Sequence, residues 1–271
     1  MNFRERVDEI IRRKNSLLCV GLDSDIGKMP EIIRSSENPL YTFNKTIIDA
    51  TIDFAAAFKV NLAFYEVYGE LGWRALKDTF NYLPDSVIRI ADAKRGDIGN
   101  TARMYARALF DGLGADAVTV NPYMGFDAAE PFLQDEEKGT FFLCLTSNPG
   151  AKDFQHFSNG TKCLYERIAE TVKKWNVRAN CGLVVGATRP NELATIRNIA
   201  PDVPFLIPGI GAQGGDLVAS VQSGTDSQGS LALFNSSRAI IYASQDDVFA
   251  AARDAARQTR QQLNQARQDN C

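Results

Sequence analysis

Four charged side chains lie within six positions of one stretch of this sequence: Asp92, Lys94, Arg95 and Asp97. They come just after an apolar run formed by Val87, Ile88 and Ile90, whose composition is typical of a β-strand. Because side chains alternate between the two faces of a strand, Asp92 and Lys94 are predicted to point to the same side. An ammonium held beside carboxylates at the end of a buried strand is costly to assemble, and such groups are typical of functional sites.

Gly96 allows the backbone to turn, which places Asp97 beyond the strand and near the start of a helix that begins at about Gly99. The alternative explanation for such a cluster is a solvated loop whose exposed ion pairs contribute little. Two features favour a site. The charges follow an almost wholly apolar strand, and other expected strands of the chain also end in polar clusters.

Apolar stretches typical of strands alternate with amphipathic helical patterns along the whole chain. The expected strands are 17–22, 57–62, 87–90, 117–120, 141–145, 182–185, 204–207 and 231–234. The expected helices lie near 42–55, 66–79, 99–112, 126–135, 161–176, 190–199, 214–222 and 246–268. Eight such units in 271 residues predict an α/β fold in which a parallel sheet closes into a single (β/α)8 TIM barrel, with one domain spanning residues 1–271.

In barrels of this kind the chemistry takes place at the C-terminal ends of the strands. Nearly every expected strand ends in polar groups, which makes this rim the predicted site. The polar residues at these ends are Asp23, Lys59, Asn61, Asp92, Lys94, Asp97, Asn121, Tyr123, Thr146, Ser147, Asn148, Thr188, Arg189, Gln213, Asn235, Ser236, Ser237 and Arg238.

The loops after the last two expected strands have the composition of a phosphate site. Four glycines at 209, 211, 214 and 215 allow the backbone to approach a ligand and leave N–H groups free at a helix start. The glycines could instead serve only as turn residues, but the neighbouring serines at 236–237 and the planar donors of Arg238 favour phosphate. The polar loop 223–230 is either a surface connection or a segment that closes over the phosphate, and closure is the expectation because the loop precedes the strand that bears Arg238.

Composition excludes several classes of function. The formal net charge is −3 without a basic stretch, which argues against nucleic-acid binding and for a small-molecule substrate. No apolar run approaches the roughly 18 residues of a membrane span, and the charged N-terminus predicts a short amphipathic helix rather than a signal peptide. The five cysteines form no Cys-x-x-Cys pair, so a reduced, cytoplasmic protein is expected. The single histidine, His156, excludes a multi-histidine metal site.

The stretch Asp92-Ala-Lys94-Arg-Gly-Asp97-Ile98 resembles the Asp-x-Lys-x-x-Asp signature of the orotidine 5′-phosphate decarboxylases. The similarity covers essentially the whole chain. It is closest to the second bacterial type at Val-Asn-Pro-Tyr-Met-Gly-Phe-Asp (120–127), Thr-Ser-Asn-Pro-Gly (146–150) and Ser-Ser-Arg (236–238). The resemblance implies decarboxylation of orotidine 5′-phosphate to UMP, the last step of de novo UMP synthesis, without a metal or another cofactor.

The same resemblance implies roles for the charged residues. Asp23 binds the ribose hydroxyls, and Lys59 helps to hold the charge network. Asp92 and Lys94 lie against the reacting carbon, with Lys94 as the cation and proton donor at C6 of the pyrimidine. Asp97 reaches into the site of the neighbouring subunit.

Further residues acquire roles in the same way. Ile98 and Thr101 accompany Asp97 across the subunit interface, which implies an obligate homodimer with two shared active sites. Ser147 resembles the serine that contacts the pyrimidine ring. Gln213 and Arg238 resemble the residues of the phosphate loop, and Ser237 is expected to bind substrate beside them.

The nearest rival is a magnesium-dependent sugar-phosphate lyase of the same barrel group, such as a 3-keto-gulonate-phosphate decarboxylase or a hexulose-phosphate synthase. Those proteins pair the shared motif with an acidic metal ligand at the end of the second strand, where this chain has Lys59 and Asn61, which disfavours a divalent cation. A catalytically silent nucleotide-binding barrel is the other alternative, and the intact set of Asp92, Lys94 and Asp97 argues against it.

The loops at 25–40 and 150–160 carry no motif of the family. The length leaves no room for a fused orotate phosphoribosyltransferase, so a stand-alone enzyme is expected.

Overall fold

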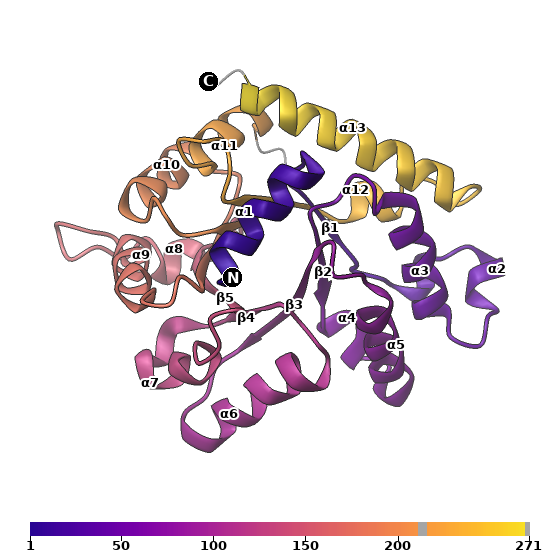
Figure 1. Cartoon of the computed structure of the whole chain (residues 1–271), viewed down its shortest axis with the longest axis horizontal. Helices are drawn as coiled ribbons and strands as arrows, with labels where there is room; N and C mark the ends of the chain where they lie inside the picture. Colours follow the sequence, from indigo (N-terminus) through magenta and orange to yellow (C-terminus); the bar gives the residue numbers. More distant parts are fainter. Residues whose placement is uncertain (211–215, 269–271) are drawn as a thin grey trace.

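The computed structural model describes residues 1–210 and 216–268, and its centre is a closed barrel of parallel strands in the order β1 to β8 (Figure 1). The barrel closes where β8 pairs with β1, with Asn235 opposite Cys19. The predicted TIM barrel is therefore confirmed. The strands are β1 (Leu18–Gly21), β2 (Ala57–Asn61), β3 (Ile88–Arg95), β4 (Ala117–Val120), β5 (Gly139–Leu145), β6 (Cys181–Val185), β7 (Phe205–Pro208) and β8 (Ala232–Ser236).

Helices surround the barrel on all sides (Figure 1). The longer ones are α1 (Phe3–Lys14), α3 (Pro39–Thr51), α5 (Gly69–Tyr82), α6 (Gly99–Arg107), α9 (Leu164–Trp175), α10 (Pro190–Ile199), α11 (Leu217–Gly224) and α13 (Val248–Gln268). Single-turn helices are α2 (Glu31–Arg34), α4 (Ala63–Glu66), α7 (Phe126–Ala129), α8 (Ala151–Phe154) and α12 (Arg238–Ile241). Irregular turns are η1 (Ile26–Lys28), η2 (Ala108–Gly112), η3 (Pro122–Met124) and η4 (Glu130–Phe132).

Two of the differences from the predicted elements concern the segments around residues 90 and 130. The helix expected at 126–135 is divided into α7 and the 3-10 turn η4, because Pro131 has no N–H to continue the α-helical hydrogen bonds. The third strand extends to Arg95 rather than ending at residue 90. Three of its last four residues, Asp92, Lys94 and Arg95, are charged. The apolar pattern from which the strand was predicted therefore ends before the strand itself does.

The sequences of the strands are continuous apolar runs because helices cover the outside of the barrel and side chains fill its inside. Every residue of β1, β4 and β6 is buried. A sheet that is buried on both faces lacks the alternation of polar and apolar residues seen in half-exposed sheets.

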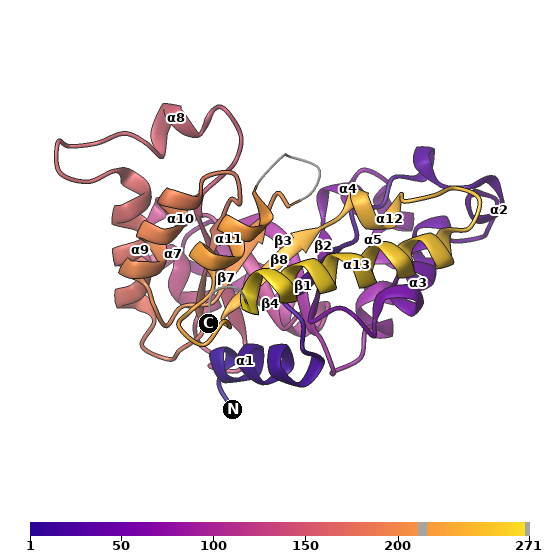
Figure 2. The ribbon, with the colours of Figure 1, turned by 90° about the horizontal axis from the view of Figure 1, so that it is seen from above.

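The N-terminal helix α1 closes the end of the barrel where the strands begin. The ring of Phe3 packs edge-on against Phe141 with ring centroids 5.7 Å apart, and a side chain at position 139 would overlap the Phe3 ring. Arg6 of α1 also forms an ion pair of 2.8 Å with the buried carboxylate of Asp116. Figure 2 shows α1 at one end of the molecule and α8 at the opposite end, so the rim where the strands finish lies away from α1.

The expectation that loop 223–230 closes over a phosphate is wrong. This loop connects α11 to the beginning of β8, so it lies at the end of the barrel that α1 covers. Ser230 donates a hydrogen bond of 2.7 Å to Asp8 of α1, and the N–H of the same serine binds Asp226. The loop is thus a surface connection at the end of the barrel remote from the strand-end rim.

A buried arginine joins the ends of α10 and α11 near the same loop. Arg197 is 7% exposed, and its guanidinium lies 3.6 Å from the centroid of the Phe205 ring. Its donors bind backbone carbonyls rather than a carboxylate, and the accepting residues are Ala200, Pro201, Val203, Gly224 and Leu231. One side chain therefore binds the carbonyl of the last residue of α11, Gly224, and carbonyls of the segment that follows α10, where the end of a helix leaves backbone groups without intrahelical partners.

We expect Arg197→Leu to lower the free energy of unfolding by about 3 kcal/mol or more, because it leaves several buried carbonyls without donors. Urea denaturation followed by circular dichroism measures this loss. The matched control is Arg257→Leu, which removes an exposed arginine that pairs with the exposed Asp254 and should change the value by less than about 0.5 kcal/mol. Equal losses in the two variants would contradict the role assigned to Arg197.

Candidate active site

A cavity of about 290 Å³ opens at the C-terminal ends of the strands. All eight strands or the loops directly after them contribute to its wall. The lining residues are Asp23, Lys59, Asp92, Lys94, Thr119, Leu143, Thr146, Ser147, Asn148, Val184, Leu206, Pro208, Gly209, Ile210, Asn235, Ser237 and Arg238. The rim predicted from the sequence is therefore hollowed into one pocket.

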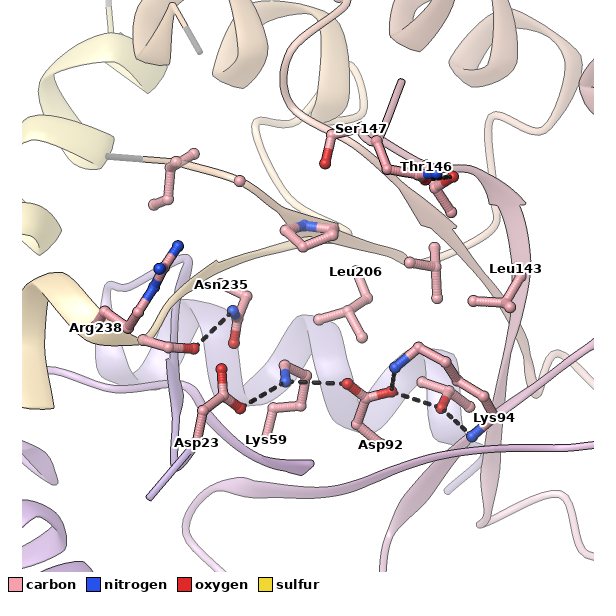
Figure 3. Close-up of a pocket in the computed structure, with 17 residues that line it drawn as sticks. Asp23, Lys59, Asp92, Lys94, Leu143, Thr146, Ser147, Leu206, Asn235 and Arg238 are labelled. Atoms are coloured by element: carbon pink, nitrogen blue, oxygen red, sulfur yellow. Dashed lines mark hydrogen bonds and ion pairs between the residues drawn. The ribbon is translucent and has the colours of Figure 1, made fainter. Parts of the chain in front are cut away.

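Along one wall of the pocket, four charged side chains of alternating sign form a row (Figure 3). Lys59 Nζ lies 3.4 Å from Asp23 Oδ1 and 3.1 Å from Asp92 Oδ2. Lys94 Nζ lies 2.7 Å from Asp92 Oδ1. Asp92 thus binds one ammonium with each of its oxygens, and the expected contact between Asp92 and Lys94 is present.

The members of this row differ in exposure. Lys59 is 5% and Asp92 is 8% exposed, whereas the side chain of Lys94 is 48% exposed and faces the cavity. Lys59 and Asp92 therefore form a buried base for the row, and Lys94 presents its ammonium to any ligand in the pocket.

Burial opposes the charge of both inner residues, but the opposite charges beside them outweigh it. The ammoniums of Lys59 and Lys94, with a hydrogen bond from Thr119, hold the pKa of Asp92 well below its usual range. The carboxylates of Asp92 and Asp23 likewise raise the pKa of Lys59 above its usual value. Both groups are therefore ionised near neutral pH.

The loop that carries Asp23 is held by two tyrosine hydroxyls. Tyr65 donates to the carbonyl of Leu22 at 2.9 Å. Tyr242 accepts the N–H of Asp25 at 2.7 Å and donates to the carbonyl of Asp23 at 3.2 Å. The backbone on both sides of Asp23 is thus fixed, which keeps its carboxylate beside Lys59.

Ser147, Ser237 and Arg238 lie at the cavity wall, as predicted. Ser147 follows Thr146, whose N–H and hydroxyl both bind the side chain of Gln155. Ser237 packs so closely on β1 that a side chain at position 21 would overlap its hydroxyl, which explains Gly21. Gln213 lies outside the described residues.

Asp97, Ile98 and Thr101 do not line the cavity of their own chain. The carboxylate of Asp97 accepts the N–H of Ile98 at 2.8 Å, Ile98 is 53% exposed, and Thr101 is exposed at the start of α6. Asn61, at the end of β2, also lies outside the cavity wall, and its side chain accepts the N–H of Ala63.

Sequence reasoning missed Thr119, which binds both Asp92 and Lys94. The available signal was a single polar residue inside the apolar run of β4, at a position that a buried strand usually fills with an apolar side chain. It also missed the apolar part of the wall, which includes Leu143, Val184 and Leu206.

No group of three or more His, Cys, Asp or Glu residues suited to a metal ion occurs among residues 1–210 and 216–268. Within the same ranges, no helix has the length and apolar character needed to cross a membrane.

A (β/α)8 barrel whose strand-end pocket offers carboxylates, ammoniums, hydroxyls and a guanidinium defines an enzyme of the barrel class that acts on a small polar molecule. Comparison with known proteins identifies the family. The profile of the orotidine 5′-phosphate decarboxylase / HUMPS family matches residues 16–254, and the chain belongs to this family.

Similar proteins support this assignment over nearly the full length. Orotidine 5′-phosphate decarboxylase of Dehalococcoides mccartyi is 48% identical over 272 residues, covering 98% of this chain and 99% of the relative. The protein of the same name from Christiangramia forsetii is 51% identical over 254 residues, covering 92% of each chain. The structure of Leishmania donovani OMP decarboxylase has 39% identity and a TM-score of 0.85, covering 98% of this chain and 99% of that one.

The depressed pKa of Asp92 predicts a pH-dependent contribution to stability. A carboxyl whose folded pKa lies below its unfolded value of about 4 stabilises the protein above that pH, and the contribution is lost as the pH falls through the folded pKa. We expect Asp92→Asn to lower the free energy of unfolding at pH 7 by about 3 kcal/mol, because Lys59 loses a buried partner. The deficit relative to wild type should shrink below about pH 4.

Urea denaturation at several pH values measures this difference. Asp111→Asn is the control, because Asp111 is an exposed aspartate whose nearest cation, Arg107, lies 3.9 Å away. A deficit for Asp92→Asn that stays constant down to pH 3 would refute the assignment of an ionised Asp92 in the folded state.

Proposed function

We propose that this protein decarboxylates orotidine 5′-phosphate to UMP, with Lys94 as the cation and proton donor at C6 of the pyrimidine. The observation that carries the proposal is the row Asp23–Lys59–Asp92–Lys94 in the strand-end pocket. This row occurs in a chain that is 48% identical to a protein named orotidine 5′-phosphate decarboxylase.

The chemistry needs a cation where negative charge develops. When the bond between C6 and the carboxylate breaks, its electron pair stays on C6 and carbon dioxide leaves. An ammonium at that position stabilises the transition state more than the ground state, which is the condition for a faster reaction. Lys94 then transfers a proton to C6, which restores the neutral pyrimidine of UMP and leaves an amine that solvent reprotonates.

The buried residues of the row hold this ammonium in position. Asp92 Oδ1 is 2.7 Å from Lys94 Nζ, and Lys59 occupies the other oxygen of Asp92. Asp92 is thereby kept from rotating away. Because the row alternates in sign, no ammonium of the row lies directly beside another.

The remaining contacts would hold the rest of the substrate. In this proposal Asp23 faces the ribose hydroxyls, Ser147 contacts the pyrimidine, and Ser237 and Arg238 bind the phosphate together with Gln213. Four of these five residues are described, and all four line the same cavity. Binding energy from a phosphate remote from C6 can assist the reaction by fixing the pyrimidine against Lys94.

We further propose that the reaction requires neither metal nor another cofactor. The related magnesium enzymes would need a carboxylate at the end of β2. In this chain β2 contributes Lys59, whose ammonium sits between Asp23 and Asp92 and competes with a cation for both carboxylates.

A homodimer with shared active sites is the third part of the proposal. Three large apolar side chains that follow β3 and β4 in the sequence are exposed: Ile98, next to Asp97 in the chain, Met104 of α6 and Tyr123 are 53%, 52% and 87% exposed. Exposed apolar side chains that gather in one patch are typical of a contact surface, and in this proposal these three belong to it. Burial of this surface against a second copy would carry Asp97 of the partner subunit to the rim near Lys94.

A cytoplasmic location agrees with the free thiols of Cys19, Cys144, Cys163 and Cys181.

Turnover and the role of Lys94 are tested in one assay. The purified protein is mixed with orotidine 5′-phosphate, with and without excess chelator, and the ultraviolet absorbance of the pyrimidine is followed. We expect UMP to form at the same rate in both. Lys94→Ala should lower kcat by at least about 10³-fold, because cation and proton donor are lost together, and should change the Kd for UMP by less than about tenfold.

Lys173→Ala, which removes an exposed lysine of α9, is the control and should turn over like wild type. Near-normal turnover of Lys94→Ala would exclude the proposed role. Loss of wild-type turnover in chelator would point to the metal-dependent relatives instead.

Shared sites predict that two inactive variants restore each other. In a mixed dimer of Lys94→Ala and Asp97→Ala, one site lacks both groups and the other has both. Random exchange should therefore recover about a quarter of wild-type activity, since half of the dimers are mixed and each holds one intact site. Activity is measured after the variants are mixed at a concentration that allows subunit exchange. No recovery, in a mixture shown by mass spectrometry to contain mixed dimers, would mean that Asp97 acts within its own chain.

A further inference from the structure

The catalytic strand is irregular at the position of Lys94. Between the pairs Ala91–Val118 and Arg95–Val120, the register of β3 against β4 shifts, so that three residues of β3 lie opposite one residue of β4, Thr119. Such a bulge interrupts the backbone hydrogen bonds between two strands and redirects side chains. The N–H of Lys94 instead donates to the side-chain oxygen of Thr119 at 2.9 Å.

The bulge gives Lys94 an unusual backbone conformation, with φ at 47°. Residues with a side chain rarely adopt this left-handed region, and they keep it only where the surrounding contacts impose it. The bond from Lys94 N–H to Thr119 is the contact that fixes this peptide group. Without it, Lys94 would be free to relax toward an extended conformation, which would change the direction of its side chain.

The same hydroxyl also fixes Asp92. Thr119 donates to Asp92 Oδ1 at 2.8 Å, and this oxygen also accepts from Lys94 Nζ at 2.7 Å. A hydroxyl has one hydrogen, so donation to Asp92 leaves its lone pairs for the N–H of Lys94. Asp92, Thr119 and both ends of Lys94 are therefore joined in one closed ring of hydrogen bonds. Thr119 is 1% exposed, which keeps bulk water from replacing it.

We propose that Thr119 is a positioning residue that aims the Lys94 ammonium by holding the left-handed backbone of Lys94 and the carboxylate of Asp92 at once. This inference rests on the proposed role of Lys94 in decarboxylation. It assigns to a neutral residue of β4 a part in the reaction that the charged row alone does not explain.

A second buried threonine of the barrel, Thr140, has a hydroxyl whose hydrogen bond serves only the fold. Thr140 of β5 is fully buried, and its hydroxyl donates to the carbonyl of Phe132 at 2.9 Å. Thr140 lies at the beginning of its strand and does not line the cavity. It therefore offers a matched control for the loss of one buried strand hydroxyl.

The test compares Thr119→Val and Thr119→Ser with Thr140→Val. Valine keeps the shape of threonine and removes the hydroxyl, whereas serine keeps the hydroxyl. We expect Thr119→Val to lower kcat for orotidine 5′-phosphate by about 100-fold, because a small misplacement of a catalytic group has effects of this size. The Kd for UMP should change by less than about threefold. Thr119→Ser should retain kcat within about fivefold of wild type.

Thr140→Val should reduce the midpoint of urea denaturation and leave kcat of the folded enzyme unchanged. If Thr119→Val does not fold, Thr119→Ala is compared with Thr119→Ser, since these two variants differ by one oxygen. Wild-type kcat in Thr119→Val or in Thr119→Ala, or equal losses in the valine and serine variants, would overturn the inference. Lys94→Ala is measured alongside: an active wild type with an inactive Lys94→Ala keeps the proposed function even where the role of Thr119 fails.

Discussion

The buried ammonium of Lys59 is the constraint on which the rest of the pocket depends. A charge taken out of water is tolerated only when opposite charges and hydrogen bonds replace the lost solvent. Lys59 obtains both from Asp23, in the loop directly after β1, and from Asp92 of β3, so the two carboxylates approach it from the strands on either side. The carboxyl ends of β1, β2 and β3 are thereby tied together, and Asp92 is held with one oxygen free for Lys94.

This arrangement follows from the closed parallel barrel. Lys59 lies opposite Gly21 on β1 and Ile90 on β3, so its side chain reaches both neighbouring strand ends from one central position. Gly21 has no side chain, which leaves room for Ser237 at the cavity wall, and the loop beyond Gly21 is fixed by Tyr65 and Tyr242. Positions on rigid strands give the precision that electrostatic catalysis requires, because preorganised charges need no rearrangement during the reaction.

Much of this could be predicted from sequence, for physical reasons that also explain the failures. Continuous apolar runs identify buried parallel strands, and the topology of a barrel then brings their polar ends together. The contact of Lys94 with Asp92 was predicted from strand alternation, whereas the structure achieves it through a bulge and a left-handed Lys94. The sequence of residues 92–94 does not by itself predict the bulge, because the bulge depends on a hydrogen bond to Thr119, which lies on another strand. Loop 223–230 was misplaced because its polar composition says nothing about which end of the barrel it occupies.

The two ends of the barrel serve different purposes. At the end covered by α1, buried ionic groups have several partners each: Asp116 binds Arg6 and Arg89, and Arg197 binds backbone carbonyls. At the opposite end, Lys94 is strained in its backbone and half-exposed in its side chain. A strained backbone and an ammonium with few partners lower the stability of the protein. The barrel tolerates this loss because the ionic contacts at the end covered by α1, a strand length away, hold its helices and strands together without any contribution from Lys94. Because the two ends are separate, the ammonium of Lys94 can remain without a full set of hydrogen-bond acceptors in the pocket. A ligand that develops negative charge would supply the missing acceptor.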